Sequence, residues 1–458
     1  MSVARFVRTF VLGQLVAACA GLRMLPPTIA LKAQDVEIVK VLGKIEIVQD
    51  STPDKPGTRA TSVRIFEARV STSALVGSER AAAAPLSVRC FLKEYMSTAG
   101  EAFGRRELMT TRKLARRWNE LQQQQHEEGN TDEGISSDFV PFPTLLGHLR
   151  TDERVLNPEF RARWAKSFPR SKAPDAGNLW LLFEWDATAF KTARSYPPLP
   201  QVVEGLDYFR RETRQKKRWA FVRRLMRKAL LSLDFVHRSG FCHNAVSSDS
   251  VWLTTTDQLL TRQLDVRLTD LGGAQRLSDL GPYARQGVAE DLYQLGFVFL
   301  ELIAASMAED GGVAAAATAR RRFFSAAGDG NGADGDAAGA AARLLSAAME
   351  RLGKGFEPSS SFSSSSSSSP PQRTHLSHKE WQWIFEGPAC NSDFQALRAV
   401  VKEHFPDASA VLEANSGVAF KLVLKLLTRG SLSDQDGKPI PLTGRSLVRD
   451  YSFLEKDV

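Results

Sequence analysis

The strongest hydrophobic pattern lies in the second half of the chain. From Val222 to Val236, apolar residues recur at intervals of three and four, which predicts a helix with one buried stripe. The run Asp291–Ile303 is apolar nearly all round, as is typical of a helix inside a large core. Two short strand-like runs, Ser250–Thr254 and Asp265–Thr269, lie between these helices. We therefore expect a mainly helical core that includes a little β-structure.

The first half of the chain has the patterns of a β-sheet. Four runs rich in apolar and β-branched residues predict strands, namely Val36–Val48, Ser62–Val70, Leu86–Tyr95 and Asn178–Asp186. Phe139–Leu149 is expected to form a further pair of strands, and Phe103–Leu121 has the period of a helix. The predicted fold class is α+β, with a small β-rich part ahead of a larger helical part.

Three stretches have the composition of insertions. Residues 122–138 are rich in glutamine and acidic residues and are expected to form an exposed loop. Residues 150–177 combine prolines with mixed charge and are expected to be another loop insertion. Residues 308–373 consist of an Ala/Gly-rich half and a serine-rich run, which together cannot bury enough apolar surface to fold. We expect a disordered insertion there, with folded sequence resuming at His375 and ending near Leu454.

Composition limits the classes of function. With 458 residues and 43% hydrophobic content, the chain is long enough for two or three domains. The net charge is +8, but four of the 60 basic residues precede the first acidic residue, Asp35, which leaves 56 basic against 52 acidic residues. No nucleic-acid partner is therefore expected. The four cysteines are scattered without a C-x-x-C pair, which argues against a disulfide scaffold and a zinc site.

Residues 1–34 have the composition of a targeting leader. They contain no acidic residue and carry an apolar run from Phe10 to Leu22 that only Gln14 interrupts. Such a segment favours import into an organelle (plastid or mitochondrion) or entry into the secretory pathway. A membrane anchor is an alternative, although Arg23 and the following prolines make the run shorter than the roughly 20 residues a span needs. An ordinary N-terminal segment of a cytoplasmic protein is the third interpretation.

The order of elements and motifs in the second half resembles the large lobe of protein kinases. The stretch from Val236 to Leu253 looks like the catalytic loop, and Thr269-Asp270-Leu271-Gly272 looks like the D-F-G element. Asp291 resembles the start of the buried helix that follows the activation segment. The resemblance implies a two-lobed protein-kinase-like fold, with a β-rich N-lobe over residues 35–182 and a hinge and helical C-lobe over residues 183–458.

The same resemblance breaks where catalysis would occur. Kinases of this type carry H-R-D-x-x-x-x-N, in which the Asp accepts the proton of the substrate hydroxyl and the Asn holds a metal ion. Here His243 matches, Ala245 replaces the Asp and Ser250 replaces the Asn. Alanine cannot accept a proton, so these three positions are degenerate and no catalytic residue is assigned. Asp249 is expected to point away from the site, because side chains alternate along a strand.

The residues that a kinase uses to hold nucleotide are better matched. Lys93, in Cys90-Phe91-Leu92-Lys93, resembles the lysine of V-A-I-K, which pairs with phosphates and with a helix glutamate. We expect Glu107 to be that glutamate. Asp270 resembles the magnesium-binding Asp, and Glu184 and Trp185 lie in the segment that resembles the hinge. The resemblance therefore implies ATP and magnesium as candidate cofactors, with these five residues as the nucleotide-binding set.

Three features argue against full kinase activity. Phe91 occupies the place of the family's alanine on the lysine's side of the strand, where an adenine ring would need space. The loop between the first two strands has one glycine, Gly57, and no G-x-G-x-x-G. Only 21 residues separate Asp270 from Asp291, and no A-P-E occurs there. A peptide-binding platform is therefore expected to be missing.

The run Arg210–Lys228 contains ten basic residues and one acidic residue, Glu212. A basic segment on an amphipathic helix can bind an anionic membrane surface. Because the opposite stripe of this helix is needed for the core, the expected role is a solvated basic face, with membrane binding as the alternative.

Three functions are consistent with the sequence. The leading hypothesis is a pseudokinase, a regulatory or scaffolding module that binds a protein partner and keeps residual ATP binding. The first alternative is an active atypical Ser/Thr protein kinase that uses a rearranged site. The second is an assembly factor associated with an organelle membrane through the leader and the basic helix.

Overall fold

The computed structural model describes the greater part of both halves of the chain. The described residues are 25, 28–32, 35–49, 59–71, 87–128, 140–151, 158–169, 172–186, 188, 191–196, 211–307, 398, 401–402, 406–427 and 442–454. They form two compact units. The first comprises residues 1–189, 232–245 and 266–280, and the second comprises the remainder. The predicted α+β class is confirmed, since a six-stranded sheet accompanies the helices.

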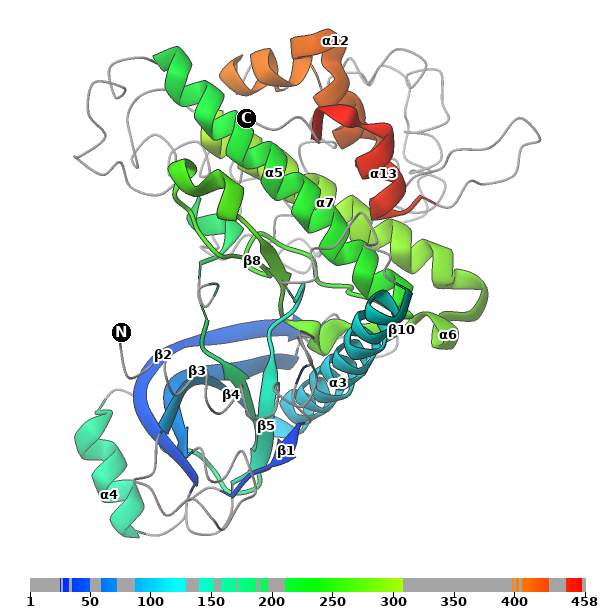
Figure 1. The fold of residues 1–458 in the computed structure, drawn as a ribbon. Coiled ribbons are helices and arrows are strands. Elements are labelled where there is room, and N and C mark those ends of the chain that lie inside the picture. Colours follow the sequence, from blue (N-terminus) through cyan, green and yellow to red (C-terminus); the bar gives the residue numbers. More distant parts are fainter. Residues whose placement is uncertain are drawn as a thin grey trace, which may run out of the picture. The chain divides into compact units, whose positions relative to one another are not determined.

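The first unit is built on one sheet with the strand order β1-β5-β6-β4-β3-β2 (Figure 1). The strands are β1 (Ile29–Ala30), β2 (Val36–Gln49), β3 (Arg59–Ser71), β4 (Ser87–Tyr95), β5 (Leu145–Arg150) and β6 (Leu179–Glu184). Neighbouring strands pair antiparallel, except that β1 runs parallel to β5. The four strands predicted from their apolar runs are confirmed. The predicted strand pair at Phe139–Leu149 is wrong for the described residues 140–149, where β5 is the one strand.

One face of this sheet carries a core of alternating side chains. Cys90 and Leu92 of β4 point into it, as the two-residue period of a strand requires. Phe66 of β3 lies at the centre, with its ring centroid 5.8 Å from that of Trp164 and 6.1 Å from that of Trp180. Trp164 belongs to helix α4 (Pro158–Ser167). Residues 150–177, expected to be a loop insertion, therefore contain a helix whose tryptophan is 4% exposed and packs in the core.

The sheet begins ahead of Asp35, within the segment assigned to a leader. Ile29 and Ala30 pair with Gly147 and His148 of β5, and the amide of Leu31 donates to the His148 carbonyl at 2.9 Å. Leu31 is buried against the core face. These bonds satisfy an edge of β5 that would otherwise present open backbone groups. Residues 1–24, 26–27 and 33–34 of the proposed leader lie outside the described residues.

Helix α3 (Ser97–Glu128) packs against the other face of the sheet (Figure 1). Its buried stripe includes Leu114 and Trp118. Gly104 is needed for close packing, because a Cβ there would lie 2.6 Å from the ring of Tyr95. The helix contains the predicted Phe103–Leu121 and continues into the stretch expected to be a loop from residue 122. Gln122 explains part of this extension, since it is 5% exposed and packs within the fold.

The second unit is mainly helical. Its long helices are α5 (Arg211–Arg238, whose last turns lie in the first unit), α7 (Ala284–Met307) and α12 (Pro406–Leu427). The short strands and α-helices of the second unit include β8 (Val251–Leu253) and α13 (Gly444–Asp450), and those of the first unit include β7 (Phe241–Cys242), β9 (Val266–Leu268), β10 (Gln275–Arg276) and α6 (Leu277–Leu280). The predicted helix around Asp291–Ile303 is confirmed as α7, and the strand-like runs are confirmed as β8 and β9.

The packing of α7 on α12 explains its all-round apolar sequence. Leu295, Phe299 and Ile303 are buried, and a Cβ at Gly296 would lie 3.0 Å from the Leu426 Cβ. No helix among the described residues is long and apolar enough to cross a membrane. The loop at residues 50–58 and the low-complexity segment 308–373 lie outside the described residues.

Removal of the Phe66 ring tests the core of the sheet. We expect Phe66→Ala to lower the free energy of unfolding by about 3–5 kcal/mol, because the ring is fully buried and its loss leaves a cavity. Met109→Ala is a control, since Met109 is 50% exposed and its loss should change stability by less than about 0.5 kcal/mol. Urea denaturation measures both, and equal effects would contradict the assignment of the core.

The thiol of Cys90 predicts how stability depends on pH. Burial raises its pKa from 9.0 to about 12. Its contribution to stability is therefore complete below pH 9 and is lost as the pH rises, because the unfolded chain releases the proton first. Between about pH 9 and 10, the free energy of unfolding should fall, by at most about 1.4 kcal/mol per pH unit for this thiol. The fall should be smaller in Cys90→Ala, and an unchanged slope would refute the prediction.

Candidate functional site

The candidate site is centred on the ammonium group of Lys93. The Lys93 Nζ lies 2.9 Å from Oε1 of Glu107 and 2.8 Å from Oδ1 of Asp270. Lys93 and Glu107 are each 2% exposed, whereas Asp270 is 24% exposed. The predicted Lys93–Glu107 ion pair is confirmed. One cation from β4 thus joins a carboxylate from α3 to a carboxylate that follows β9.

The electrostatics favour the charged form of Lys93. Burial by itself lowers the pKa of a lysine, but the adjacent carboxylates of Asp270 and Glu107 outweigh it, and the pKa of Lys93 is raised. The ammonium therefore keeps its proton throughout the physiological range. Tyr95 donates its hydroxyl hydrogen bond to Oε2 of Glu107, and burial together with that carboxylate raises the pKa of Tyr95 well above its usual value. Both oxygens of Glu107 consequently have donors.

Helix α3 also positions the loop that carries Asp270. The backbone of Asp270 is left-handed, with φ 64°, and the short helix η6 (Leu271–Gly273) follows it. The Arg106 Nε donates to the Gly272 carbonyl at 3.0 Å. A Cβ at Gly272 would lie 2.0 Å from Phe103, so glycine is required there. The same helix therefore sets both the Glu107 side chain and the loop after β9.

His243 is held by backbone groups on both ring nitrogens. Its Nε2 lies 2.8 Å from the Thr269 carbonyl, which can only accept, so Nε2 carries the proton. Its Nδ1 accepts from the Ala245 amide at 3.3 Å. The ring is fully buried and serves to link the loop at Ala245 to the strand before Asp270. It is thus a structural residue in this arrangement.

Ala245 and Asn244 complete this loop. The Ala245 side chain is a methyl group, and a Cβ on Gly273 would lie 3.4 Å from it. Asn244 has a left-handed backbone with φ 60°, and its Nδ2 donates to the Gly273 carbonyl at 3.2 Å. The Ala245 side chain, at the position where the resemblance to kinases implied a proton acceptor, is therefore an apolar methyl group, and Asn244 ties the loop to Gly273.

The sheet face beside Lys93 is filled by aromatic rings. Phe91 and Phe183 stack with centroids 5.0 Å apart, and each is 1% exposed. The Lys93 Nζ lies 5.5 Å from the Phe183 centroid. Phe91 shares the lysine's face, as predicted. Lys93 and Asp270 suit the phosphate and magnesium end of a nucleotide, since an ammonium binds phosphate and Mg²⁺ takes carboxylate oxygens. A purine ring does not fit this face while Phe91 lies on Phe183.

The two residues assigned to a hinge lie at the end of β6. Glu184 pairs in the sheet with Cys90, which lies three residues before Lys93 on β4. The Glu184 amide donates to the Thr144 carbonyl at 2.9 Å. The Trp185 ring lies 3.8 Å from the Arg89 guanidinium in a cation–π contact. The structure therefore places Glu184 at the end of β6, next to β4, and Trp185 directly after it, and both residues are engaged in packing or backbone bonds.

Ser250 and Asp249 belong to the second unit and make local contacts there. The Ser250 Oγ accepts from the Ser247 amide at 2.8 Å and donates to the Ser247 carbonyl at 3.0 Å. Asp249 accepts from Arg194 at 2.8 Å. Ser250 is therefore used to close a turn, and Asp249 is used in an ion pair.

Sequence reasoning missed Tyr95 and Arg106 as site residues. The alternation of β4 had already placed Tyr95 on the lysine's face, so its position was predictable but its bond to Glu107 was not. Arg106 is adjacent to Glu107 in sequence, and nothing in a single helix indicates that its guanidinium reaches a carbonyl 166 residues away.

Removal of the central cation tests whether the site holds the first unit together. We expect Lys93→Met to lower the free energy of unfolding by about 3 kcal/mol or more, because it leaves the buried Glu107 carboxylate without its counterion. Arg105→Gln on the same helix is the control. It breaks an exposed pair with Glu101 and should cost less than about 1 kcal/mol. A Lys93→Met effect no larger than the control would contradict this role.

The comparisons with known proteins add no identity to this geometry. No protein-family model matches the chain. No curated protein matches it either. The contacts of Lys93, Glu107, Asp270 and Ala245 are therefore the basis for the function proposed next.

Proposed function

We propose that this protein is a pseudokinase, a protein of the two-lobed kinase-like fold that regulates or scaffolds a protein partner without transferring phosphate. The observation that carries the proposal is the Lys93–Glu107–Asp270 cluster beside a loop in which Ala245 stands at the proton-accepting position. A site that keeps charged binding groups but lacks a general base can bind a ligand without transferring phosphate, as the proposal requires.

The retained cluster supports a phosphate-binding type of site. A lysine, a helix glutamate and an aspartate after a short strand have the spacing that the resemblance to kinases implied, and they meet in space. Asp270 is partly open to solvent. The ammonium and this carboxylate are the groups that could hold a triphosphate and its magnesium ion.

Two features support the absence of phosphate transfer. A general base contributes about 10²–10⁴-fold to such a reaction, and the Ala245 methyl cannot act as one. His243, the nearest imidazole of the loop, has both nitrogens engaged by backbone groups. Asp249, the acid closest in sequence, is paired with Arg194. The described loop thus offers no evident substitute.

Stacking of Phe91 on Phe183 supports weak nucleotide binding at most. An adenine on this face requires the Phe91 ring to move out of a contact in which it is 1% exposed. Ordered aromatic pairs of this kind contribute about 0.5–1.5 kcal/mol beyond burial, and this energy opposes the opening. The proposed module therefore regulates its partner through its surface and its conformation.

Thermal unfolding with ATP and magnesium tests the proposal. We expect little stabilisation of the wild-type chain and a larger one for Phe91→Ala, because loss of the ring opens space beside Lys93. A ligand at a hundredfold excess over its Kd adds about 2.7 kcal/mol, so the difference is measurable. Phe160→Ala is the control, since Phe160 packs on the opposite face of the sheet. Each variant is compared with its own ligand-free state.

A phosphate-transfer assay separates the proposal from the first alternative. The wild-type chain and Phe91→Ala should both be inactive towards protein substrates and towards themselves. Transfer by the wild-type chain that Asp270→Ala abolishes would instead establish an active atypical kinase. If neither chain is stabilised by nucleotide, the phosphate-binding part of the proposal is wrong and only a scaffold remains.

A further inference from the structure

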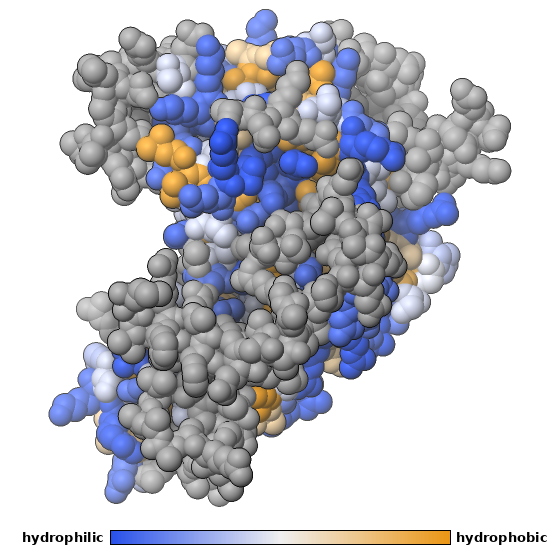
Figure 2. Space-filling model, viewed as in Figure 1, coloured by the Kyte–Doolittle hydropathy of each residue, from blue (hydrophilic) through white to orange (hydrophobic). Residues whose placement is uncertain are grey.

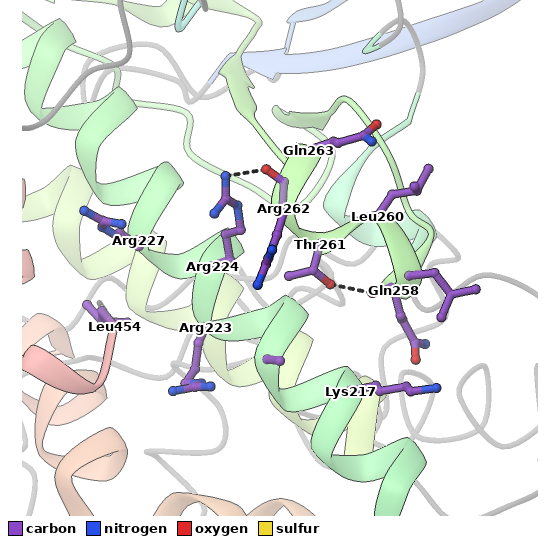
Figure 3. Close-up of a pocket in the computed structure, with 12 residues that line it drawn as sticks. Lys217, Arg223, Arg224, Arg227, Gln258, Leu260, Thr261, Arg262, Gln263 and Leu454 are labelled. Carbon is purple, nitrogen blue, oxygen red and sulfur yellow. Dashed lines mark hydrogen bonds between the residues drawn. The ribbon is translucent and has the colours of Figure 1, made fainter. Parts of the chain in front are cut away.

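The basic helix α5 does not supply an exposed basic surface. Arg223, Arg224 and Arg227 are each half-buried. Arg223 donates to the Phe453 carbonyl at 3.0 Å, and Arg224 donates to the Arg262 carbonyl at 2.7 Å (Figure 3). The expected solvated face is therefore wrong for this part of α5. An exposed basic surface lies instead on a helix of the first unit.

The outward side of α3 carries four basic residues and a methionine. Arg105, Met109, Arg112, Lys113 and Arg116 are all exposed, and we call these five residues the α3 surface. Their spacing of three and four residues places them on one side of the helix. At a rise of 1.5 Å per residue, the row from Arg105 to Arg116 is about 16 Å long. The part of the molecule where α3 reaches the surface is largely hydrophilic (Figure 2).

Three cations of the α3 surface, Arg112, Lys113 and Arg116, have no carboxylate partner among the described residues. Arg112 donates to Nδ1 of His148 at 3.3 Å. Burial and the adjacent Arg112 lower the pKa of His148, so this ring is a neutral acceptor. The Lys113 ammonium lies 5.8 Å from the centroid of the Phe241 ring, which also carries no charge. The positive charge of these three side chains is therefore available to an acidic partner.

The acids of α3 on either side of this surface bind other cations. Glu101 accepts a hydrogen bond from Arg105 at 2.8 Å and another from Arg150 of β5. Glu120 pairs with Arg117 at 3.1 Å. Since each of these carboxylates already has a basic partner, neither one compensates the central part of the α3 surface.

Met109 gives the α3 surface an apolar centre. Its side chain is 50% exposed and lies among the basic residues, although methionine is usually buried. The flexible thioether adapts to different apolar partners, and methionine is common at binding surfaces. A partner that presents carboxylates together with apolar side chains, as an acidic amphipathic helix does, matches both features. A nucleic-acid backbone would use the cations alone.

The inward side of α3 holds this surface in place before a partner binds. Glu107 is bonded to Lys93 and to the Tyr95 hydroxyl, and the Arg106 Nε donates to the Gly272 carbonyl at 3.0 Å. These contacts tie the helix to the sheet and to the loop after β9. A surface on a fixed helix loses little conformational freedom on binding, which favours affinity.

We propose that the α3 surface binds an acidic amphipathic helix of a protein partner, with carboxylates on Arg112, Lys113 and Arg116 and an apolar side chain on Met109. A second copy of the chain is a poor occupant, because two copies of α3 packed face to face would bring like charges together. The inference names the chemistry of the partner in the proposed function and rests on that function for its role. It uses no side chain of the Lys93 cluster, so nucleotide binding and partner binding can fail separately.

Fluorescence anisotropy of a labelled peptide with the full chain tests the surface. The probe is a synthetic peptide in which leucine and glutamate recur at helical spacing, and a scrambled peptide of the same composition is compared with it. We expect the helical peptide to bind more tightly and its binding to weaken as salt is raised, because exposed charges are screened. Arg116→Glu should weaken binding about tenfold or more, since it replaces an attraction with a repulsion. Met109→Ser should also weaken binding, because it removes the apolar contact.

Arg161→Glu is the matched control for the change in net charge. Arg161 is exposed on α4, which packs on the opposite face of the sheet from α3. Its substitution should leave the affinity for the peptide unchanged. Arg112→Glu is a second variant of the α3 surface, and it keeps the test valid if Arg116→Glu does not fold.

Four results would overturn the proposal. They are the absence of peptide binding, equal affinity for the scrambled peptide, an unchanged affinity in Met109→Ser, and an equal loss of affinity in Arg161→Glu. The last result would mean that binding depends on net charge alone. Single-stranded RNA and vesicles that contain phosphatidic acid are tested with the same variants. If either one binds through Arg116 while the peptide does not bind, the surface serves a different class of partner and the proposal is wrong.

Discussion

A single buried ammonium group between two carboxylates organises the first unit. Lys93 comes from the sheet, and Glu107 comes from the helix that covers one face of the sheet. Asp270 lies 177 residues after Lys93 in the chain. A buried charge is costly unless it is paired, so loss of Lys93 would leave the buried Glu107 carboxylate without its counterion. Tyr95 and Arg106 extend the same cluster by binding Glu107 and the carbonyl of Gly272.

In the proposed pseudokinase, Lys93 and Asp270 are the binding groups, and Ala245 stands where the resemblance to kinases implied a proton acceptor. The loop from His243 to Ala245 is ordered by backbone hydrogen bonds, and its imidazole is used to hold the chain in place. Aromatic stacking of Phe91 on Phe183 fills the neighbouring face. An ordered loop that lacks a proton acceptor suits a protein that its partner recognises in one fixed conformation. This is the physical basis of the proposed pseudokinase role.

The second unit shows how a highly basic helix can serve a packed fold. Arginines of α5 donate hydrogen bonds to the carbonyls of Arg262, Leu264 and Phe453. These guanidinium groups therefore satisfy backbone acceptors of the packed fold. Arg223, Arg224 and Arg227 also line one cavity, together with Leu259 and Leu260. Net charge and helical period alone do not distinguish this arrangement from a solvated basic surface, because both have the same sequence pattern.

The sequence by itself determined which residues share a face. The two-residue period of β4 placed Cys90 and Leu92 in one core and Phe91 and Lys93 on the other side, and the period of α5 placed its apolar stripe inside. Tertiary structure alone decided the partners: Trp164, from a stretch expected to be a loop insertion, packs on Phe66, Asp270 binds the Lys93 ammonium, and the Phe453 carbonyl accepts from Arg223. Local periodicity is set by backbone geometry and is visible in neighbouring residues. Contacts across 177 or 230 residues depend on how separate elements pack, and no local pattern encodes them.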